Sequence, residues 1–199
     1  MKALTWHGKR DVRIETVPDP TIQKPTDAIV RLTTTGLCGS DLHLYEVLGA
    51  FLTEGDILGH EPMGIVEEVG DDVTNLKPGD RVVIPFNISC GHCFMCEHGL
   101  QSQCETTQNR DQGTGGSLFG YTKLYGSVPG AQAELLRVPL AGYNHIRIPE
   151  DGEGMPDERF FYLSDVLSTA WQAVAYADVP EGGTLGVIGL GPIGDMSTR

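Results

Sequence analysis

The first 150 residues alternate short apolar and β-branched runs with turns that contain glycine or proline. Such runs are typical of strands, and the pattern predicts four of them. They cover residues 28–32, 64–69, 81–84 and 133–138. The polar stretch 75–80 predicts a turn into the third of these strands, because it contains a Pro-Gly pair. Strands at this spacing favour an irregular barrel or sandwich over a βαβ repeat.

The pattern changes after residue 160. Apolar residues recur there at helical spacing, which predicts a helix with Ser164 as its N-cap. The face consists of Val166, Ala170, Ala173, Val174 and Ala177. Residues 180–183 end this helix, and residues 184–188 predict a buried strand. We therefore expect a mainly β domain over residues 1–155 and the start of an α/β unit over 156–199.

The net charge of the chain limits the classes of partner that it is expected to bind. The chain has 27 acidic and 14 basic residues, a formal net charge of -13. Nucleic acids and anionic membranes need clustered Lys and Arg, so neither is an expected partner. The first twenty residues lack the apolar core of a signal peptide, and no run approaches the roughly 18 apolar residues of a membrane span. A cytoplasmic location is the resulting prediction.

Four cysteines lie within one short segment, residues 90–104, in the spacing C-x2-C-x2-C-x7-C: Cys90, Cys93, Cys96 and Cys104. Thiolates this close together can converge on one tetrahedral ion, and zinc suits four sulfur ligands best. The alternative is a pair of disulfides, which a reducing compartment and the very short loops disfavour. A four-cysteine site has no open position, so it would hold the loop and carry out no reaction.

A second set of candidate ligands is dispersed along the chain. Cys38, His60 and Asp165 together match the three protein ligands of a catalytic zinc, which keeps its fourth position open. Taken singly, each has an ordinary alternative explanation. A lone cysteine is often a small buried apolar residue, a lone histidine is often structural, and an aspartate at a helix start is favoured by the helix dipole.

A glycine motif follows the last predicted strand. Its sequence is Gly-Leu-Gly-Pro-Ile-Gly, and the candidate cofactor contacts are Gly189, Gly191, Pro192, Ile193 and Gly194. Glycines in this arrangement let the backbone approach a dinucleotide pyrophosphate at a helix start. The alternative is an ordinary glycine-rich turn. The acidic residue expected about 20 positions later would lie beyond Arg199.

Four motifs in this order resemble the zinc-dependent medium-chain alcohol dehydrogenases, over essentially all 199 residues. They are residues 36–43 (GLCGSDLH), residues 59–61 (GHE), the four-cysteine run and residues 189–194 (GLGPIG). The best-known members carry a cysteine where this chain has Asp165. An aspartate there resembles the branch that contains glutathione-independent formaldehyde dehydrogenase.

The resemblance implies a GroES-like catalytic domain followed by a Rossmann coenzyme domain. It implies that Cys38, His60 and Asp165 bind a catalytic zinc, with Glu61 behind it as an occasional ligand. Ser40 and His43 would relay a proton. The four-cysteine run would bind a second, structural zinc, which makes two per chain. The implied reaction transfers hydride between a small alcohol, or an aldehyde hydrate, and NAD or NADP, and the implied full-length protein is a homo-oligomer.

The chain is shorter than this resemblance requires, because only the first predicted strand and the glycine turn of a coenzyme domain are present. The hypothesis is therefore the N-terminal half of a longer dehydrogenase, with impaired activity in this chain. The alternative is a non-catalytic, zinc-stabilised domain. Zinc-free quinone reductases of the same fold are disfavoured by the intact ligands. Five apolar side chains could line a substrate pocket or simply pack in the core: Leu44, Tyr45, Leu48, Phe51 and Trp171.

Overall fold

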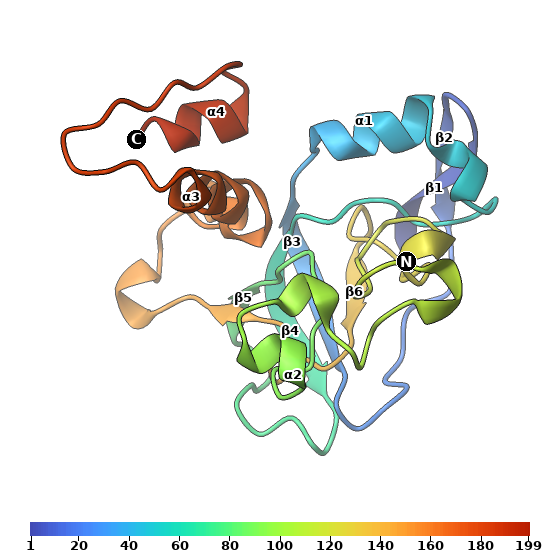
Figure 1. Cartoon of the computed structure of the whole chain (residues 1–199). Coiled ribbons are helices and arrows are strands. Elements are labelled where there is room, and N and C mark those ends of the chain that lie inside the picture. Colours follow the sequence, from blue (N-terminus) through green and yellow to red (C-terminus); the bar gives the residue numbers. More distant parts are fainter.

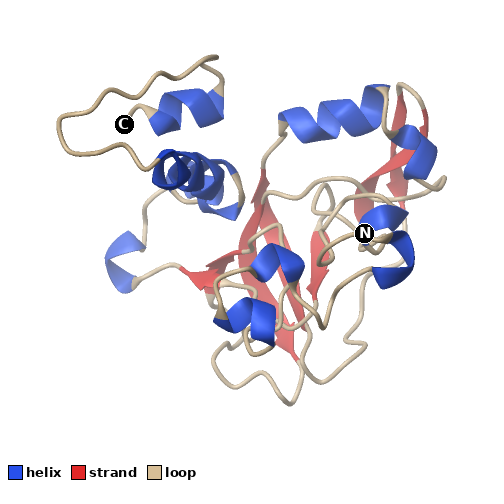
Figure 2. Ribbon diagram, in the orientation of Figure 1, coloured by secondary structure: helices blue, strands red, loops and turns tan.

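The structure is a computed structural model that describes all residues from 1 to 199. A β-rich body carries helix α1 (Gly39–Glu46) along one edge, and a C-terminal arm with α3 (Val166–Ala177) and α4 (Pro192–Ser197) lies beside it (Figure 1). Strands are confined to the body, and the arm contains only helices and loops (Figure 2). No helix combines the length and the apolar character needed to cross a membrane.

A five-stranded antiparallel sheet forms the centre of the body. In spatial order its strands are β6 (Leu135–Val138), β3 (Ala28–Thr35), β4 (Pro62–Val69), β5 (Arg81–Val83) and β7 (Ile146–Arg147). A separate hairpin consists of β1 (Lys2–Gly8) and β2 (Asp11–Thr16). The mainly β prediction is confirmed, and each of the four predicted strand segments overlaps a strand of the central sheet. The hairpin and β7 were not predicted.

The core lies against this sheet and is built from its apolar positions. The largest cluster of buried side chains joins Val30, Val66, Val82 and Leu136, from four different strands, to Phe119 of the long loop. Burying such side chains contributes roughly 1.5–3 kcal/mol each, so the sheet and the loop stabilise one another. The sheet is therefore a rigid support for the segments that leave its strand ends.

Short helical turns connect the strands. The four-cysteine segment contains α2 (Phe94–Glu97). Single 3-10 turns cover Gly49–Phe51, Gln101–Gln103, Arg110–Gln112, Lys123–Tyr125, Glu150–Gly152, Asp157–Arg159 and Phe161–Ser164. Residues 105–130 otherwise form the long loop that their composition predicts.

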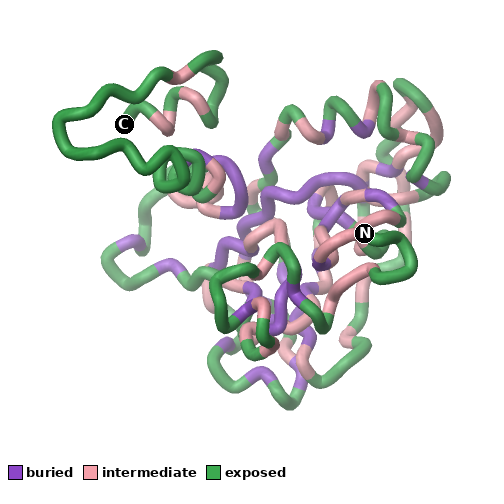
Figure 3. The backbone as a smooth tube through the Cα atoms, viewed as in Figure 1, coloured by how far each residue is buried: buried purple, intermediate pink, exposed green.

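Two predictions for the C-terminal arm are wrong. The N-cap of α3 is Asp165, and the Ser164 hydroxyl instead donates to the carbonyl oxygen of Phe161 at 2.6 Å. Residues 184–188 form no strand, and Ile188 is fully exposed. A strand needs a neighbour to bond its backbone groups, and no strand lies beside this segment. The arm is accordingly the most exposed part of the chain (Figure 3).

An ion pair ties the start of the arm to the sheet. Arg81 of β5 donates to Asp157, and the guanidinium also lies 5.4 Å from the centre of the Phe160 ring. Thr33 and Thr34 of β3 donate to the other carboxylate oxygen of Asp157. Burial would raise the pKa of Asp157, but these hydrogen bonds and the arginine charge lower it. The segment that leads to Asp165 is thereby fixed to two strands.

Candidate metal centres and the adjoining cleft

The four cysteines of residues 90–104 converge in the structure. Their sulfur atoms all lie within 4.8 Å of one another, and none forms a disulfide. Cys90 Sγ is 4.0 Å from Cys96 Sγ, and Cys93 Sγ is 3.9 Å from Cys104 Sγ. A tetrahedral zinc with bonds of about 2.3 Å would separate its sulfurs by about 3.8 Å. The donor set and its spacing therefore fit a closed zinc site.

Backbone groups favour the thiolate form of Cys93 and Cys104, whereas burial raises the pKa of Cys96 to about 12. The Cys90 amide donates to Cys104 Sγ, and the Glu105 amide donates to Cys93 Sγ, each at 3.4 Å. Burial alone would raise the pKa of Cys104, but hydrogen bonds, first from the Thr107 side chain, lower it to about 6. Ionised sulfur is the form that binds a metal.

A second cluster unites Cys38, His60, Glu61 and Asp165. One potential ligand atom from each lies within 4.8 Å of the others. Cys38 is the N-cap of α1, His60 and Glu61 immediately precede β4, and Asp165 is the N-cap of α3. The fold thus brings together three segments that are distant in sequence, each at the end of a regular element.

Glycines allow the chain to cross itself beside this cluster. Gly59, next to His60, has a φ of +98°, and a Cβ on it would lie 2.7 Å from the backbone nitrogen of Gln132. A Cβ on Gly120 would lie 2.1 Å from the carbonyl oxygen of Gly59. Gly36 fits under Glu61, because a Cβ there would be 1.9 Å from Glu61 Oε2. Larger residues at these positions would displace the side chains of His60 and Glu61.

Three polar atoms of this cluster, both ring nitrogens of His60 and Oε1 of Glu61, are buried without partners. His60 is fully buried, with Nδ1 3.3 Å from Asp41 Oδ1 and Nε2 3.3 Å from Asp165 Oδ2. Despite these distances, neither nitrogen makes a hydrogen bond of acceptable geometry, and Glu61 Oε1 has no partner either. Unsatisfied buried groups are rare in native proteins. Sulfur, imidazole and carboxylate ligands facing one another fit a zinc ion.

Proton affinities in the cluster reflect its burial and charge. Burial alone would lower the pKa of His60, but Asp165, Asp41 and Cys38 raise it to about 12. Burial raises the pKa of Glu61 to about 7. Burial would also raise the pKa of Asp165, whereas its contacts with His60 and Thr169 lower it. Without a metal, protonation of the His60 imidazole provides the positive charge that offsets the neighbouring carboxylates. A dication bound in this position would provide that charge instead.

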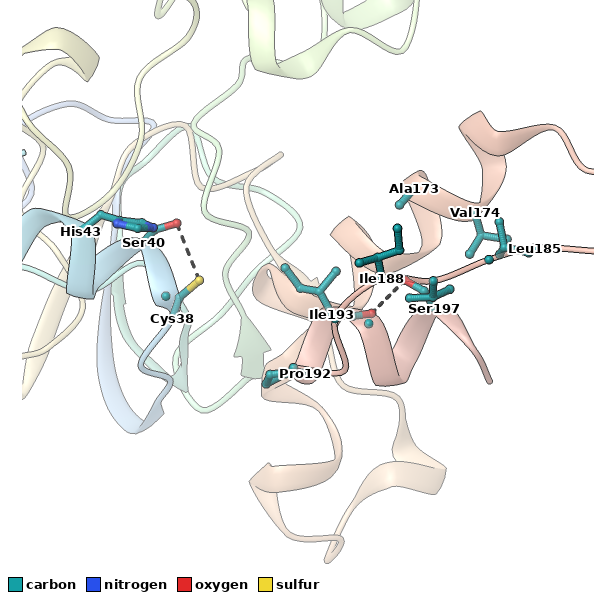
Figure 4. Close-up of a pocket in the computed structure, with 16 residues that line it drawn as sticks. Cys38, Ser40, His43, Ala173, Val174, Leu185, Ile188, Pro192, Ile193 and Ser197 are labelled. Atoms are coloured by element: carbon teal, nitrogen blue, oxygen red, sulfur yellow. Dashed lines mark hydrogen bonds between the residues drawn. The ribbon is translucent and has the colours of Figure 1, made fainter.

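The cluster opens onto a cavity of about 710 Å³ between α1 and the C-terminal arm. Cys38, Ser40 and His43 lie on one side of it, and Pro192 and Ile193 lie on the other (Figure 4). Cys38 Sγ is 3.8 Å from Ser40 Oγ. The predicted relay residues and the glycine motif thus line one space.

The glycine motif forms a tight turn into α4. Gly189 has a φ of +93°, Gly191 is the N-cap and Pro192 is the first helical residue. A Cβ on Gly194 would lie 1.9 Å from the Gly189 carbonyl oxygen, so only glycine fits there. The predicted contacts Gly189, Gly191, Pro192, Ile193 and Gly194 all line the cavity. The preceding strand is absent, so the turn is present without its usual sheet.

Two residues of the site were missed in the sequence. Asp41 Oδ2 accepts the Cys38 amide at 2.9 Å, while Oδ1 faces His60, so one carboxylate links two clustered residues. Its position three residues after Cys38 is a capping-box signal that could have identified it. Tyr121, from the loop without a predicted role, places its ring 5.0 Å from that of His60. Nothing in the sequence around Tyr121 signals this contact.

None of the five apolar residues proposed as a pocket lining borders the cavity beside Cys38. Leu44 is buried in a core cluster with Leu52 and Leu58. Trp171 lies on α3, 77% exposed, and lines a different cavity from the one beside Cys38. Core packing is therefore the better explanation for Leu44, and Trp171 belongs to another surface.

Comparisons with known proteins agree with this architecture. Residues 24–150 match the family described as "Alcohol dehydrogenase GroES-like domain". The chain is 50% identical to "Uncharacterized zinc-type alcohol dehydrogenase-like protein AdhB" of Bacillus subtilis, over 98% of this chain and 50% of that protein. It is 35% identical to "Glutathione-independent formaldehyde dehydrogenase" of Pseudomonas aeruginosa, over 97% of this chain and 49% of that protein.

Among solved structures, alcohol dehydrogenase TADH from Thermus sp. ATN1 superposes with a TM-score of 0.88 at 39% identity. The superposition covers 99% of this chain and 53% of that one. The chain therefore spans about half the length of these relatives. Because the family match covers more than half of the chain, the chain belongs to the alcohol dehydrogenase GroES-like domain family, with zinc-type alcohol dehydrogenases among its relatives.

Proposed function

We propose that the chain is the zinc-binding catalytic part of an oxidoreductase that transfers hydride between a small alcohol, or an aldehyde hydrate, and NAD or NADP. One observation carries this proposal. Cys38, His60, Glu61 and Asp165 converge beside a cavity that also contains the glycine turn. In this proposal residues 1–155 are the catalytic domain, and residues 156–199 begin the coenzyme domain.

The proposed metal site uses Cys38, His60 and Asp165 as ligands, with Glu61 as a further carboxylate within reach. The zinc would act as a Lewis acid toward the substrate oxygen. Asp41 would hold His60 in the ligating orientation, as carboxylates commonly do for metal-bound histidines. The cluster of four cysteines would bind a structural zinc that keeps residues 90–104 folded.

Ser40 and His43 have the chemistry of a proton relay in this site. Both line the cavity, and the Ser40 hydroxyl is next to the Cys38 sulfur. A hydroxyl can accept the proton of a substrate alcohol and donate its own to a neighbouring imidazole. On the other wall, the glycine turn would receive the pyrophosphate of the cofactor, because it leaves backbone amides unobstructed.

Metal content and cofactor binding test this proposal. Purified chain should hold two zinc ions, and NADH should quench the fluorescence of the exposed Trp171. A chimera that joins residues 1–199 to the second half of the B. subtilis relative should reduce NAD or NADP with a small alcohol. Asp165→Asn should abolish this turnover, whereas Asp178→Asn, at the exposed other end of α3, should preserve it. A chimera that turns over unchanged with Asp165→Asn would refute the site.

One observation favours a second function, a zinc-stabilised domain without catalysis. Residues 184–188 form no strand, so the glycine turn lacks the sheet that normally supports it. In that case both zinc ions would remain bound to the chain, and NADH would not bind to it. The cofactor titration therefore separates the two functions.

A further inference from the structure

The imidazole of His60 is fully buried, yet no hydrogen bond fixes the rotation of its ring. Nδ1 faces Asp41 Oδ1 and Nε2 faces Asp165 Oδ2, each at 3.3 Å, but neither contact has the geometry of a hydrogen bond. Metal-binding histidines are usually oriented by a hydrogen bond from the nitrogen that does not bind the metal. The Asp41 carboxylate provides charge next to Nδ1, and packing around the ring is the other way to fix its orientation.

Two aromatic side chains contact the His60 ring. The Tyr121 ring lies 5.0 Å from it, centre to centre, with 53° between the two planes. Phe86 contacts the imidazole edge-on, at 6.3 Å and 72°. Aromatic pairs prefer centre-to-centre distances of about 4.5–7 Å in offset or edge-on arrangements. Both contacts are within this range, and Tyr121 makes the closer one.

The backbone crossing at Gly59 and Gly120 places Tyr121 beside His60. A Cβ on Gly120 would lie 2.1 Å from the Gly59 carbonyl oxygen, so the two segments touch at these glycines. His60 and Tyr121 directly follow them in the sequence, and the crossing therefore brings both to the same point of the fold. The Gly120 amide donates to the carbonyl oxygen of Val128 at 2.9 Å, which fixes this part of the long loop.

The Tyr121 ring is itself held by its surroundings. It packs against the core cluster of Leu44, Leu52 and Leu58. Tyr125 contacts it edge-on, with 6.0 Å between ring centres. A side chain packed in this way loses its rotational freedom when the protein folds, and none remains to be lost when a ligand binds. Tyr121 can therefore act as a fixed wall for His60.

The contact of Tyr121 with His60 uses the ring and not the hydroxyl. Neither imidazole nitrogen has a hydrogen-bond partner, so the Tyr121 hydroxyl does not bond to His60. Burial raises the pKa of this hydroxyl above its ordinary value, so it is uncharged at neutral pH and adds no charge to the cluster. A phenylalanine ring in the same place would preserve the contact.

We propose that Tyr121 is a positioning residue for the metal cluster: its ring keeps the His60 imidazole in the orientation that directs Nε2 toward Asp165, whether or not a metal is bound. The inference rests on the proposed function for the metal that His60 would bind. The orientation of the ring depends only on packing within the chain. A ligand that is oriented in advance loses less entropy on binding, so loss of the Tyr121 ring should weaken metal binding at His60 without removing a ligand.

Nuclear magnetic resonance of the chain with isotope-labelled histidine and tyrosine tests the packing without any substitution. Titration with the chelator dipicolinate removes the metal from His60, and the ring nitrogen signals of His60 report its loss at this site alone. In the resulting state, nuclear Overhauser effects should connect ring protons of His60 and Tyr121. The tyrosine ring current should also shift the His60 signals away from those of an exposed histidine. Absence of both effects would overturn the proposal.

Two substitutions then separate the ring of Tyr121 from its hydroxyl. Tyr121→Leu keeps an apolar side chain against the core cluster but removes the aromatic contact, so His60 should lose its metal at about one fifth of the wild-type dipicolinate concentration. Tyr121→Phe keeps the ring and should stay within about twofold of wild type.

Phe94→Leu is the matched control. The Phe94 ring is 60% exposed and stacks at 4.1 Å on His98, a histidine that belongs to neither cluster. This variant removes an aromatic ring from a histidine elsewhere, so the dipicolinate midpoint of His60 should equal that of wild type.

Two outcomes of the titration would overturn the assignment. A wild-type midpoint in Tyr121→Leu would show that the ring does not position His60. An equal loss in Tyr121→Phe and Tyr121→Leu would assign the effect to the hydroxyl. If Tyr121→Leu does not fold, the nuclear Overhauser effects of the wild-type chain decide the question.

The wild-type titration separates this inference from the proposed function. If the His60 nitrogens never give a metal-bound signal in the wild-type chain, the proposed metal site fails, while the nuclear Overhauser effects still decide the packing. If His60 binds metal equally well in wild type and in Tyr121→Leu, the proposed function stands and the positioning role fails.

Discussion

The two clusters of metal-binding residues are assembled in opposite ways. The four cysteines all come from residues 90–104 and converge on one point, with Cys96 on the short helix α2. The cluster at Cys38 draws on three segments that meet only because the sheet, α1 and α3 are in place. The first cluster organises its own segment, whereas the second depends on the whole fold.

The surroundings of the two clusters also indicate different roles. The cysteine cluster consists of four sulfur ligands and no other type of ligand. The other cluster has a buried histidine without hydrogen bonds, an unpartnered glutamate and a cavity alongside. A closed donor set suits a structural ion, and a mixed set beside open space suits chemistry. Substitutions should therefore damage stability in one cluster and turnover in the other.

The largest expected effect is on turnover, from Cys38→Ser. In the chimera, loss of a ligand should remove the Lewis acid, which is worth several kcal/mol, so activity should fall about 10³-fold or more. One zinc ion should disappear from metal analysis, while the melting temperature changes little. A large fall in melting temperature would contradict the assignment of catalytic and structural roles to different clusters.

Cys93→Ser should have the reverse profile. Because metal binding contributes directly to folding of the cysteine segment, its loss should destabilise the protein. A loss of about 3 kcal/mol would lower the melting temperature of a domain this size by about 6–12 °C. The melting temperature is measured by calorimetry, with Cys38→Ser as the matched variant. The same profile for both variants would abolish the distinction.

Asp41→Asn tests whether the dispersed cluster depends on support from outside its ligands. Asparagine can still accept the Cys38 amide, but it removes the negative charge that faces His60. Loss of such a partner typically weakens metal affinity about 10–100-fold. Competition with a chelator measures this affinity. Asp80→Asn is the control, because Asp80 accepts the amide of Lys77 in the same way but belongs to neither cluster.

The smallest effect concerns the ion pair that fixes the approach to Asp165. Asp157→Asn should cost about 1–2 kcal/mol at neutral pH, because it weakens hydrogen bonds from Arg81, Thr33 and Thr34. The folded state lowers the pKa of Asp157 from 3.8, so its stabilising effect is complete above that pH and is lost as the pH falls through the lower folded value.

Urea unfolding of wild type and Asp157→Asn at several pH values measures this difference. The two midpoints should differ most at neutral pH and converge below about pH 3.8. A difference that grows as the pH falls would contradict the assigned role of Asp157. Zinc content measured at neutral pH should be the same in both proteins, because Asp157 belongs to neither cluster.

The same contrast between a local and a dispersed cluster explains how much of the structure the sequence predicts. The cysteine spacing alone indicates a shared ion, because neighbouring residues cannot move far apart. Cys38, His60 and Asp165 are separated by 22 and 105 positions, so their residue types made them only candidate ligands of one zinc, which the resemblance to a family then supported. Their convergence depends on the packing of three elements, which no local pattern encodes.

Local signals also failed where tertiary contacts decide the outcome. Ser164 is a good N-cap by type, yet the chain reaches α3 through a 3-10 turn that uses its hydroxyl elsewhere. Residues 184–188 have the composition of a buried strand, but no neighbouring strand bonds to them. Asp41 could have been identified from its spacing to Cys38, whereas the contact of Tyr121 with His60 depends on the course of a long loop.

The close backbone crossing at Gly59, Gly120 and Gly130 affects how a saturation mutagenesis screen would be interpreted. A Cβ on Gly130 would lie 2.3 Å from the carbonyl oxygen of Leu58, so all three positions admit only hydrogen as a side chain. Variants at these glycines should be depleted as severely as variants of His60, although no glycine there takes part in chemistry. A ranking of positions by fitness loss alone would therefore place these three glycines among the residues that take part in the chemistry.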